Sequence, residues 1–409
     1  MTQQKRQLED WITSYLDYAD NTESTFNFKQ WSAISGIAAC LQRKCRLEWG
    51  SETFFPNMYV VLVAPPGGAR KGTAMKPIQQ FLGELEIKLA PDSVTREALI
   101  QALEESCQTI EDEHGKDIGL HCSLTAFCPE LAVFIGNQNY NFISELTDWF
   151  DCKDRWEWKT KKSGVNVIDN LFFNLIGATT PDLIKTTLPI EIIGGGLASR
   201  MLFVFEAKKE KICPFPTFKK ELRTPLIEDL RQIQELKGVF KYTREVIDRY
   251  IDWYTDHDKN PPFTSDRFTG YNSRRQVHLL KLCMIMSASR SNEMVIELRD
   301  FERALGALKK IEYKMPQAFG SFGRLSEADI MNSIMTTIGT HGEVMFSDIM
   351  SKYLQDVDAK TLEQMVSALE KANYINIVEM PGIGVKLVYR GESSNTLAQS
   401  LGTNKETGA

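Results

Sequence analysis

The alternation of apolar and polar residues predicts a central α/β region. Short continuous apolar runs predict buried strands, and the apolar residues between these runs recur at helical spacing. Five strands interleaved with helices indicate a sheet flanked by helices, with a binding site where the strands end. The runs that carry this prediction are Tyr59–Val63, Ile87–Leu89, His121–Phe127, Leu171–Gly177 and Met201–Phe205.

Helical periodicity also predicts helices in the segment that precedes this region. Residues 1–50 contain two helical patterns, the second beginning at Asn27, and we expect both helices to pack on the α/β core of residues 51–207. Trp11 and Trp31 lie on these helices at helical spacing. Aromatic residues in such a pattern are more typical of a core than of a ligand contact, although stacking on a bound base is the alternative.

Two further regions follow the α/β core. Residues 208–318 begin with a charged linker and continue with four helical patterns, which predicts an all-helical lid domain. Residues 324–391 show three helical patterns and then a hairpin pattern, the elements of a winged helix. Residues 392–409 are polar, and we expect them to be disordered.

Composition limits the class of protein. A chain of 409 residues with 43% hydrophobic and 25% charged residues is typical of a soluble protein with two or three domains. It has no apolar run of the roughly 20 residues that span a bilayer, and its N-terminus lacks a signal-peptide core, so we expect a cytoplasmic protein without membrane contact. The net charge of -6 argues against a protein that coats nucleic acid but allows a local basic element. The eight cysteines lack zinc-site spacing, and we expect buried free thiols.

The segment NMYVVLVAPPGGARKGT, residues 57–73, has the order strand, phosphate loop, helix. Small residues let backbone N–H groups point at phosphate oxygens, a lysine reaches the outer phosphates, and the following helix adds its positive dipole end. The match to GxxxxGK[ST] is imperfect, because Pro65 and Arg70 replace the outer glycines and Gly72 separates Lys71 from Thr73. We interpret the segment as an ATP-binding loop with Thr73 near Mg²⁺, and an ordinary Gly-rich turn is the alternative. The residues expected at the nucleotide are Pro66, Gly67, Gly68, Ala69, Arg70, Lys71, Gly72 and Thr73.

Polar residues follow two other predicted strands. Glu130 comes after the strand that ends near Phe127, where phosphate-loop ATPases carry a glutamate that polarises the attacking water. Those enzymes usually have an aspartate beside it, and Pro129 stands there instead. A structural role at a helix N-terminus is the alternative for Glu130. Thr179 and Thr180 follow the next buried strand and can sense a γ-phosphate, although Thr-Thr-Pro is also ordinary turn chemistry.

Residues 154–169 read as a β-hairpin with a basic tip. Two tryptophans alternate with charged residues before the turn, and β-branched residues alternate after it. Its lysines, Lys159, Lys161 and Lys162, can follow a nucleic-acid backbone if several copies surround a channel. Taken alone, a solvated hairpin end is the more common explanation.

In their order along the chain, these motifs resemble those of AAA+ ATPases of phages and mobile elements, and their layout is similar to that of the minichromosome maintenance helicases. The resemblance implies an AAA+ P-loop core with a helical lid and a C-terminal winged helix. The basic hairpin is similar in position to the pre-sensor hairpin of those helicases. The segment LASRMLF resembles their arginine-finger segment, which implies that Arg200 reaches a neighbour's nucleotide. SRRQVHLLKL resembles their sensor-two helix, which implies that Arg274 or Arg275 contacts nucleotide; solvated arginines are the alternative.

The resemblance and the motifs together predict an ATP-hydrolysing motor that assembles into a ring, a hexamer in this family, and moves along DNA, as a replicative helicase of a phage or mobile element does. Lys71, Glu130 and Arg200 would be its catalytic residues, and single-stranded DNA would lie in a central channel. The alternative is a helicase loader or regulator that binds ATP and turns it over slowly, which the missing aspartate favours. A small nucleotide kinase is a third possibility, but it leaves the helical and winged regions unexplained.

Overall fold

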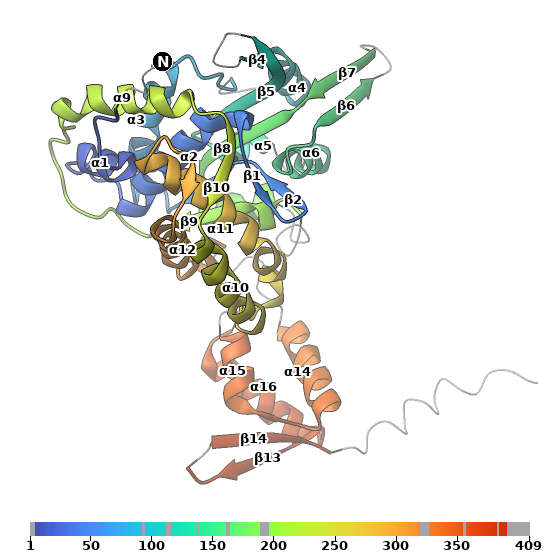
Figure 1. The fold of residues 1–409 in the computed structure, drawn as a ribbon. Coiled ribbons are helices and arrows are strands. Elements are labelled where there is room, and N and C mark those ends of the chain that lie inside the picture. Colours follow the sequence, from blue (N-terminus) through green and yellow to red (C-terminus); the bar gives the residue numbers. More distant parts are fainter. Residues whose placement is uncertain are drawn as a thin grey trace, which may run out of the picture. The chain divides into compact units, whose positions relative to one another are not determined.

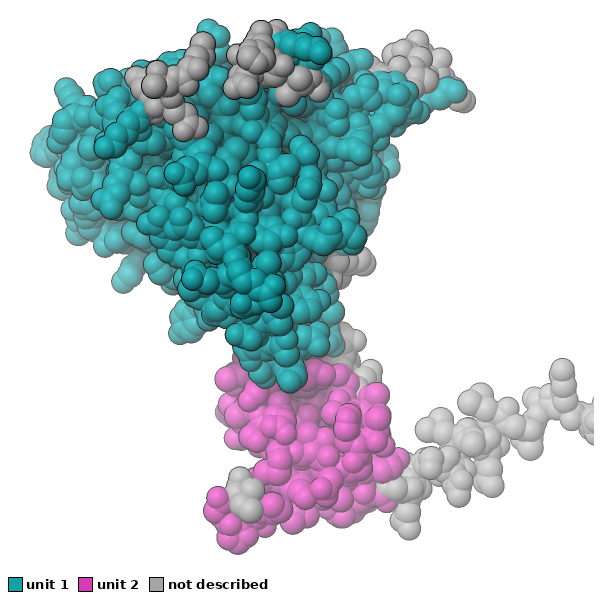
Figure 2. All heavy atoms as spheres, viewed as in Figure 1, with its two compact units in different colours: residues 1–320 teal, residues 321–409 magenta. Residues whose placement is uncertain are grey.

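The fold is that of an α/β protein whose chain divides into two compact units, residues 1–320 and residues 321–409 (Figure 2). The computed structural model describes residues 5–91, 95–111, 116–136, 139–160, 164–188, 196–319, 327–354, 357–382 and 384–390. Within these residues, no helix combines the length and the apolar character needed to cross a membrane.

A five-stranded sheet forms the centre of the first unit (Figure 1). The strand order is β4-β5-β8-β3-β9, in which β4 runs antiparallel to β5 and the other neighbours are parallel. Every residue of β3, β8 and β9 is buried, which explains their continuous apolar runs. The predicted α/β sheet is therefore confirmed, but the expected strand Ile87–Leu89 is not one of its members: Leu89 makes only an isolated bridge to Thr125, and β4 is the fifth strand. The strands are β3 (Tyr59–Val63), β4 (Cys107–Glu111), β5 (Asp117–Cys128), β8 (Leu171–Thr179) and β9 (Met201–Phe205).

Helices pack around this sheet. Helix α2 lies against α3 and β8, and Gly36 permits the close approach, because a Cβ there would lie 2.8 Å from Ile78 Cγ2. Trp11 and Trp31 are fully buried, so both belong to the core. Thr25 accepts a hydrogen bond from the Phe28 N–H, which starts α2 one residue before the predicted position. The helices are α1 (Trp11–Tyr18), α2 (Phe26–Leu41), α3 (Lys71–Glu84), α4 (Arg96–Glu105), α5 (Leu131–Ile135), α6 (Tyr140–Phe150) and α7 (Pro181–Thr187).

A second sheet, with the strand order β11-β10-β1-β2, was not predicted. It joins residues from both ends of the first unit, because β1 pairs in parallel with β10. The prediction that residues 208–318 are all helical is therefore wrong. These strands have only two to five residues, which is too few for an alternation of apolar and polar residues to identify them in the sequence. They are β1 (Cys45–Trp49), β2 (Glu52–Phe54), β10 (Gly238–Tyr242) and β11 (Val295–Ile296).

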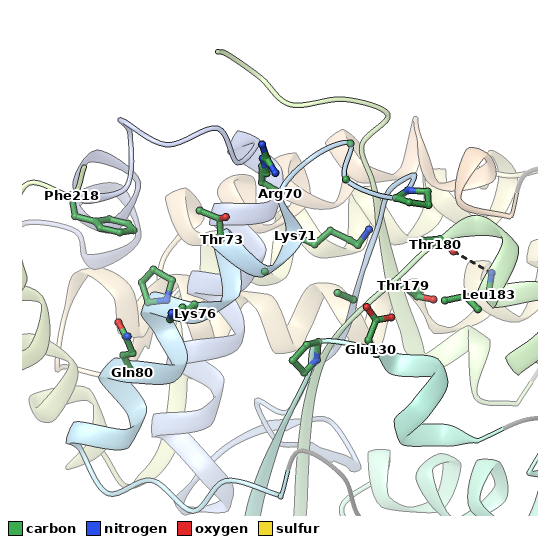
Figure 3. A pocket seen from close by; sticks show the side chains of 17 residues that line it. Arg70, Lys71, Thr73, Lys76, Gln80, Glu130, Thr179, Thr180, Leu183 and Phe218 are labelled. Carbon is green, nitrogen blue, oxygen red and sulfur yellow. Dashed lines mark hydrogen bonds between the residues drawn. The ribbon is translucent and has the colours of Figure 1, made fainter. Parts of the chain in front are cut away.

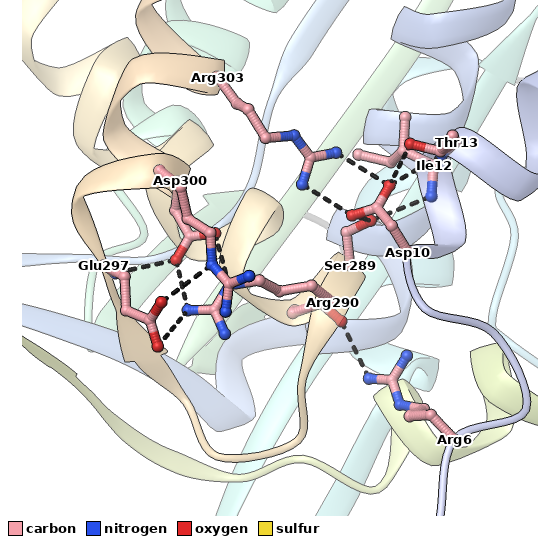
Figure 4. A network of polar contacts seen from close by, with 11 residues as sticks. Arg6, Asp10, Ile12, Thr13, Ser289, Arg290, Glu297, Asp300 and Arg303 are labelled. Carbon is pink, nitrogen blue, oxygen red and sulfur yellow. Dashed lines mark hydrogen bonds and ion pairs between the residues drawn. The ribbon is translucent and has the colours of Figure 1, made fainter.

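Polar contacts fasten the N-terminal segment to the last helices of the first unit (Figure 4). Arg303 donates to both carboxylate oxygens of Asp10 at 2.7 and 2.9 Å, and Ser289 Oγ donates to Asp10 at 2.9 Å. Residues 208–318 thus belong to the same compact unit as the central sheet. The helices of this region are α9 (Lys220–Gln234), α10 (Arg244–Lys259), α11 (Thr269–Arg290), α12 (Leu298–Glu312) and α13 (Met315–Ala318).

The first unit contains two hairpins, of which the one over residues 154–169 was predicted from the sequence. Strands β4 and β5 form one, and β6 (Arg155–Thr160) with β7 (Gly164–Asp169) forms the other. In the first hairpin Cys107 and Cys122 stand opposite each other and form a disulfide. The prediction that all eight cysteines are free is therefore wrong for this pair, which only the strand register brings together. The other six are free and buried.

The second unit has its own small core of apolar side chains from three helices and a sheet. The sheet has the order β12-β14-β13, and Asp358 caps α16 by accepting a hydrogen bond from the Thr361 N–H at 2.9 Å. The predicted order of three helices and a hairpin is present, with one extra short strand. The elements are α14 (Glu327–His341), β12 (Glu343–Met345), α15 (Phe346–Tyr353), α16 (Ala359–Lys371), β13 (Ile375–Met380) and β14 (Gly384–Tyr389).

Candidate functional site

Three neighbouring parallel strands end at one edge of the central sheet. Strand β8 pairs with β3 on one side and with β5 on the other, so that Thr179 lies opposite Val63 and Gly177 lies opposite Cys128. The Ala64 N–H also donates to the Thr179 carbonyl oxygen at 3.3 Å. The three segments that follow these strands therefore meet at the carboxyl edge, the usual place for a ligand in an α/β sheet.

The candidate phosphate loop, residues 64–70, turns sharply between β3 and α3. Gly67 has φ of +68°, and the Gly68 N–H donates to the Pro65 carbonyl oxygen at 3.1 Å. Gly68 also lies close to a neighbouring backbone, since a Cβ there would lie 3.1 Å from the Ala207 carbonyl oxygen. Arg70 has φ of +55° and ψ of +47°, a left-handed conformation that glycine favours. The loop thus bends where a glycine would stand in the pattern, although Arg70 occupies that position.

Lys71 is the first residue of α3, and its side chain folds back over the loop. Its Nζ donates to the Ala64 carbonyl oxygen at 2.9 Å. Burial lowers the pKa of Lys71, and the nearby Glu130 carboxylate counteracts part of that shift. The amine, the loop amides and the N-terminus of the 14-residue helix α3 together form a positive site suited to an anion.

A cavity of about 1000 Å³ opens at this place (Figure 3). It brings together residues from the loop, the start of α3, the end of β5 and the end of β8. Ala69 is buried and does not line it, whereas the other predicted loop residues do. The predicted residues that line the cavity are Pro66, Gly67, Gly68, Arg70, Lys71, Gly72, Thr73, Glu130, Thr179 and Thr180.

Glu130 precedes α5 at the cavity wall, next to Pro129. Its side chain accepts no hydrogen bond from the first turn of α5, so it does not act as a capping group there. The residue is exposed, and Figure 3 shows its carboxylate beside Thr179 and facing Lys71 across the cavity. This placement suits a carboxylate that accepts a proton from water, and the purely structural alternative has no hydrogen bond to support it.

The two threonines after β8 differ in their environment. Thr180 Oγ1 accepts a hydrogen bond from the Leu183 N–H at 3.3 Å and so caps α7. Thr179 is buried, with 2% of its surface exposed, and is the last residue of β8. The turn role predicted as an alternative is therefore present at Thr180, while Thr179 is a wall residue of the cavity.

The residues present fit a nucleoside triphosphate with its magnesium ion. Loop amides and Lys71 offer donors to phosphates, and the cavity volume suits a nucleotide-sized ligand. In the part of the chain that the structure describes, no group of three or more His, Cys, Asp or Glu side chains is arranged to hold a metal ion. Magnesium at nucleotides is commonly held by phosphate oxygens, water and one or two protein oxygens. Thr73 and Glu130 supply a hydroxyl and a carboxylate for that purpose.

Arg200 and Arg274 meet outside this cavity, at Asp151. Arg200 Nη2 donates to Asp151 Oδ2 at 2.7 Å, and Arg274 Nη1 lies 3.5 Å from Asp151 Oδ1. Arg200 is 8% exposed, and its Nε has no hydrogen-bond partner in the described structure. Arg274 and Asp151 line a different cavity of about 510 Å³. The structure thus brings these two predicted arginines together, away from the candidate phosphate loop of the chain.

Arg275, unlike Arg274, is buried in an ion pair. It is 5% exposed and donates to both carboxylate oxygens of Glu312 at 2.6 and 2.8 Å. Its guanidinium also lies over the Trp253 ring, 5.5 Å from the ring centre. These contacts hold α10, α11 and α12 together, and Arg275 does not line the candidate nucleotide cavity.

The basic hairpin is only partly described. Lys159 lies on β6 and is exposed. Lys161 and Lys162, the other predicted DNA contacts, lie outside the described residues.

Sequence reasoning missed several residues in the cavity wall and one residue that holds the loop from outside. Phe218, in a segment interpreted as a linker, forms part of the wall, as do Lys76 and Gln80, one turn apart on α3. Glu23 holds the loop from outside, since its carboxylate accepts from Arg70 Nε at 2.8 Å and from the Cys213 N–H at 3.2 Å. Lys76 and Gln80 follow Thr73 by three and seven residues, and this same-face helical spacing is a signal that was available, whereas nothing local marks Glu23.

Comparison of the chain with protein families and with curated proteins does not assign a function to this site. The chain matches no protein-family model, and no curated protein matches it significantly. Any functional assignment therefore depends on the chemistry and geometry of the residues themselves.

Proposed function

We propose that the chain is an ATP-hydrolysing motor of the AAA+ class that assembles into a ring and acts on DNA. One observation carries this proposal: Lys71, Glu130 and Thr179, from the ends of three adjacent strands, face one nucleotide-sized cavity. A lysine at a helix start, a free carboxylate and a hydroxyl at a strand end are the groups that phosphoryl transfer to water needs. In this proposal the second unit is a winged helix.

The chain's own residues would divide the work within the cavity. Lys71 and the loop amides would hold the β- and γ-phosphates, and Thr73 would supply a hydroxyl to the magnesium ion. Bound magnesium would neutralise charge that develops on the phosphate oxygens. Glu130 accepts a proton from the water that attacks the γ-phosphorus, and Thr179 orients that water or the phosphate. The bond to the β-phosphate oxygen breaks, and ADP and phosphate leave.

A neighbouring subunit would complete the site. Arg200 and Arg274 lie outside the cavity of their own subunit, and Asp151 holds both. In an assembly these arginines would face the next subunit's phosphates, where an arginine is worth on the order of 10³ to 10⁵ in rate. Hydrolysis would therefore depend on assembly.

DNA would contact the exposed hairpin. Lys159 is exposed, and Lys161 and Lys162 follow it in the sequence, so a ring would place several such tips around a channel. Helix α16 of the second unit carries Lys360 beside Glu363, and a mixed-charge helix of this kind is poorly suited to reading bases.

Two replacements in the expected motifs favour the second candidate, an ATP-controlled loader or regulator with slow turnover. Pro129 stands where motors carry an aspartate beside the catalytic glutamate, and Gly72 stands where the pattern has a hydroxyl residue. Both replacements remove oxygen atoms that would hold magnesium. Such a site binds ATP but hydrolyses it slowly.

Turnover measured together with particle mass tests the proposal. ATP hydrolysis is measured with and without single-stranded DNA, across protein concentrations that change the mass in solution. The motor predicts turnover that rises with assembly and with DNA; ATP binding with little turnover under all conditions supports the loader. Arg200→Ala subunits mixed with Lys71→Ala subunits should regain part of the activity that each lacks alone. No recovery in assembled mixtures would contradict a shared site.

A further inference from the structure

We propose that the end of the cavity away from Glu130 binds the base of the nucleotide, that Phe218 stacks on this base, and that Gln80 selects adenine. This inference rests on the proposed function, because it takes the phosphates to lie at Lys71. It adds the recognition of the base, which neither the loop nor the catalytic groups address.

The cavity is longer than its phosphate end. Its lining residues fall into two groups in Figure 3, one around Lys71 and Glu130, and the other around Gln80, Lys76 and Phe218. Helix α3 connects them, and the nine residues from Lys71 to Gln80 rise about 14 Å along its axis. That length is comparable to an extended nucleoside triphosphate, so a ligand with its phosphates at the loop would place its base at the second group.

Phe218 is fixed as a flat apolar surface. Its ring stacks on Tyr18 with the ring centres 4.9 Å apart and an angle of 21° between the planes. The backbone is pinned on both sides, since the Thr217 N–H donates to the Asn21 carbonyl oxygen at 3.0 Å and the Lys219 N–H donates to the Tyr18 carbonyl oxygen at 3.1 Å. Phe218 remains half-buried and lines the cavity. A base that stacks on it would extend an existing aromatic pair at little entropic cost.

Gln80 supplies the polar contact at this end. It is exposed on α3 and lines the cavity, and its amide has no hydrogen-bond partner among the described residues. A glutamine amide offers one acceptor and two donors, which matches the adjacent amino group and ring nitrogen of adenine. Guanine presents two acceptors at the equivalent edge, so the glutamine carbonyl would be left unpaired there. The pairing favours adenine.

Phe218→Ala tests the stacking, with ATP and inorganic tripolyphosphate as calorimetric titrants. We expect the ATP dissociation constant to rise roughly 10-fold, as for the loss of one base–aromatic stack, with tripolyphosphate affinity unchanged. Phe215→Ala is the matched control, because Phe215 is 86% exposed and does not line the cavity. Phe218→Leu keeps an apolar side chain against Tyr18 and removes the aromatic face, so it should also weaken ATP binding if the alanine variant fails to fold.

The outcomes separate the two proposals. Unchanged ATP affinity in a folded Phe218→Leu or Phe218→Ala variant would place the base elsewhere and overturn this inference alone. Equal affinity of the wild type for ATP and tripolyphosphate would do the same. A wild type that binds neither titrant would overturn the proposed function. Gln80→Ala should reduce the preference for ATP over GTP, and a wild type that binds GTP as tightly as ATP would refute the selection of adenine.

Discussion

Replacement of Arg70 by glycine or by alanine tests the loop geometry through its energetics. Arg70 adopts a left-handed backbone with φ of +55°, which costs a non-glycine residue about 1 to 2 kcal/mol. Glycine avoids this strain but loses about 0.5 to 1 kcal/mol through its more flexible unfolded chain. Both variants lose the ion pair with Glu23, in which the Arg70 side chain is half exposed. Such a pair contributes at most about 1 kcal/mol, and the loss is common to both.

The difference in unfolding free energy between the two variants therefore measures the contribution of the backbone conformation at residue 70. We expect Arg70→Gly to be more stable than Arg70→Ala by about 1 kcal/mol, the reverse of the usual order. Gly83 lies within α3 with open space around its Cα and no positive φ, so Gly83→Ala should show the usual order and raise stability.

Urea unfolding followed by tryptophan fluorescence is the suitable assay. All seven tryptophans lie before residue 320, so the signal reports on the first unit alone. The variants are compared when their unfolding free energies depend on urea concentration with the same slope. A shift in the urea concentration at the unfolding midpoint then measures a change in stability. If Arg70→Ala proved as stable as Arg70→Gly, the left-handed turn at the start of α3 would be refuted.

Three further predictions concern the packing and titration of the first unit. Gly36→Ala should destabilise it by about 1 to 3 kcal/mol in urea unfolding, because the new methyl group would lie 2.8 Å from Ile78 Cγ2; an unchanged midpoint would contradict the tight packing of α2 on α3. Glu312→Gln should cost about 3 to 5 kcal/mol by leaving the buried Arg275 guanidinium without its ion-pair partner, and a loss below 1 kcal/mol would argue that Arg275 finds water or another acceptor. Burial lowers the pKa of His278 to about 3, so the unfolded chain binds a proton below about pH 6.5 that the folded chain does not, and stability falls as the pH drops from there toward 3. His278→Gln should reduce the slope of stability against pH between 6.5 and 5 by up to about 1.4 kcal/mol per pH unit, and equal slopes would contradict a neutral buried imidazole.

Features that depend on local pattern were predictable from the sequence. Strands β3, β8 and β9 are buried on both faces, so their apolar runs stand out. The hairpin of β6 and β7 follows from alternation around a turn. The turn between β3 and α3 was also predicted, because the order strand, glycines, lysine, helix is present although Arg70 stands where the pattern has glycine.

Features that depend on pairing across the chain were not predictable. Strand β1 pairs with β10 across about 190 residues, and neither has a distinctive pattern of its own. Cys107 and Cys122 become neighbours only through the register of β4 and β5. Phe218 reaches the cavity from a segment with linker composition, because its ring packs on Tyr18 from the first helix. Such contacts are properties of tertiary structure.

The most direct test of the nucleotide site is the stabilisation of the protein by ATP in the wild type, in Lys71→Ala and in Lys88→Ala. Lys71 lines the cavity, whereas Lys88 is an exposed lysine of the same unit that does not. ATP at 100 times its dissociation constant stabilises a protein by about 2.7 kcal/mol. We expect ATP to raise the unfolding midpoint of the wild type and of Lys88→Ala, and to leave that of Lys71→Ala nearly unchanged. Equal stabilisation of all three proteins, or none of the wild type, would contradict a nucleotide site at this loop.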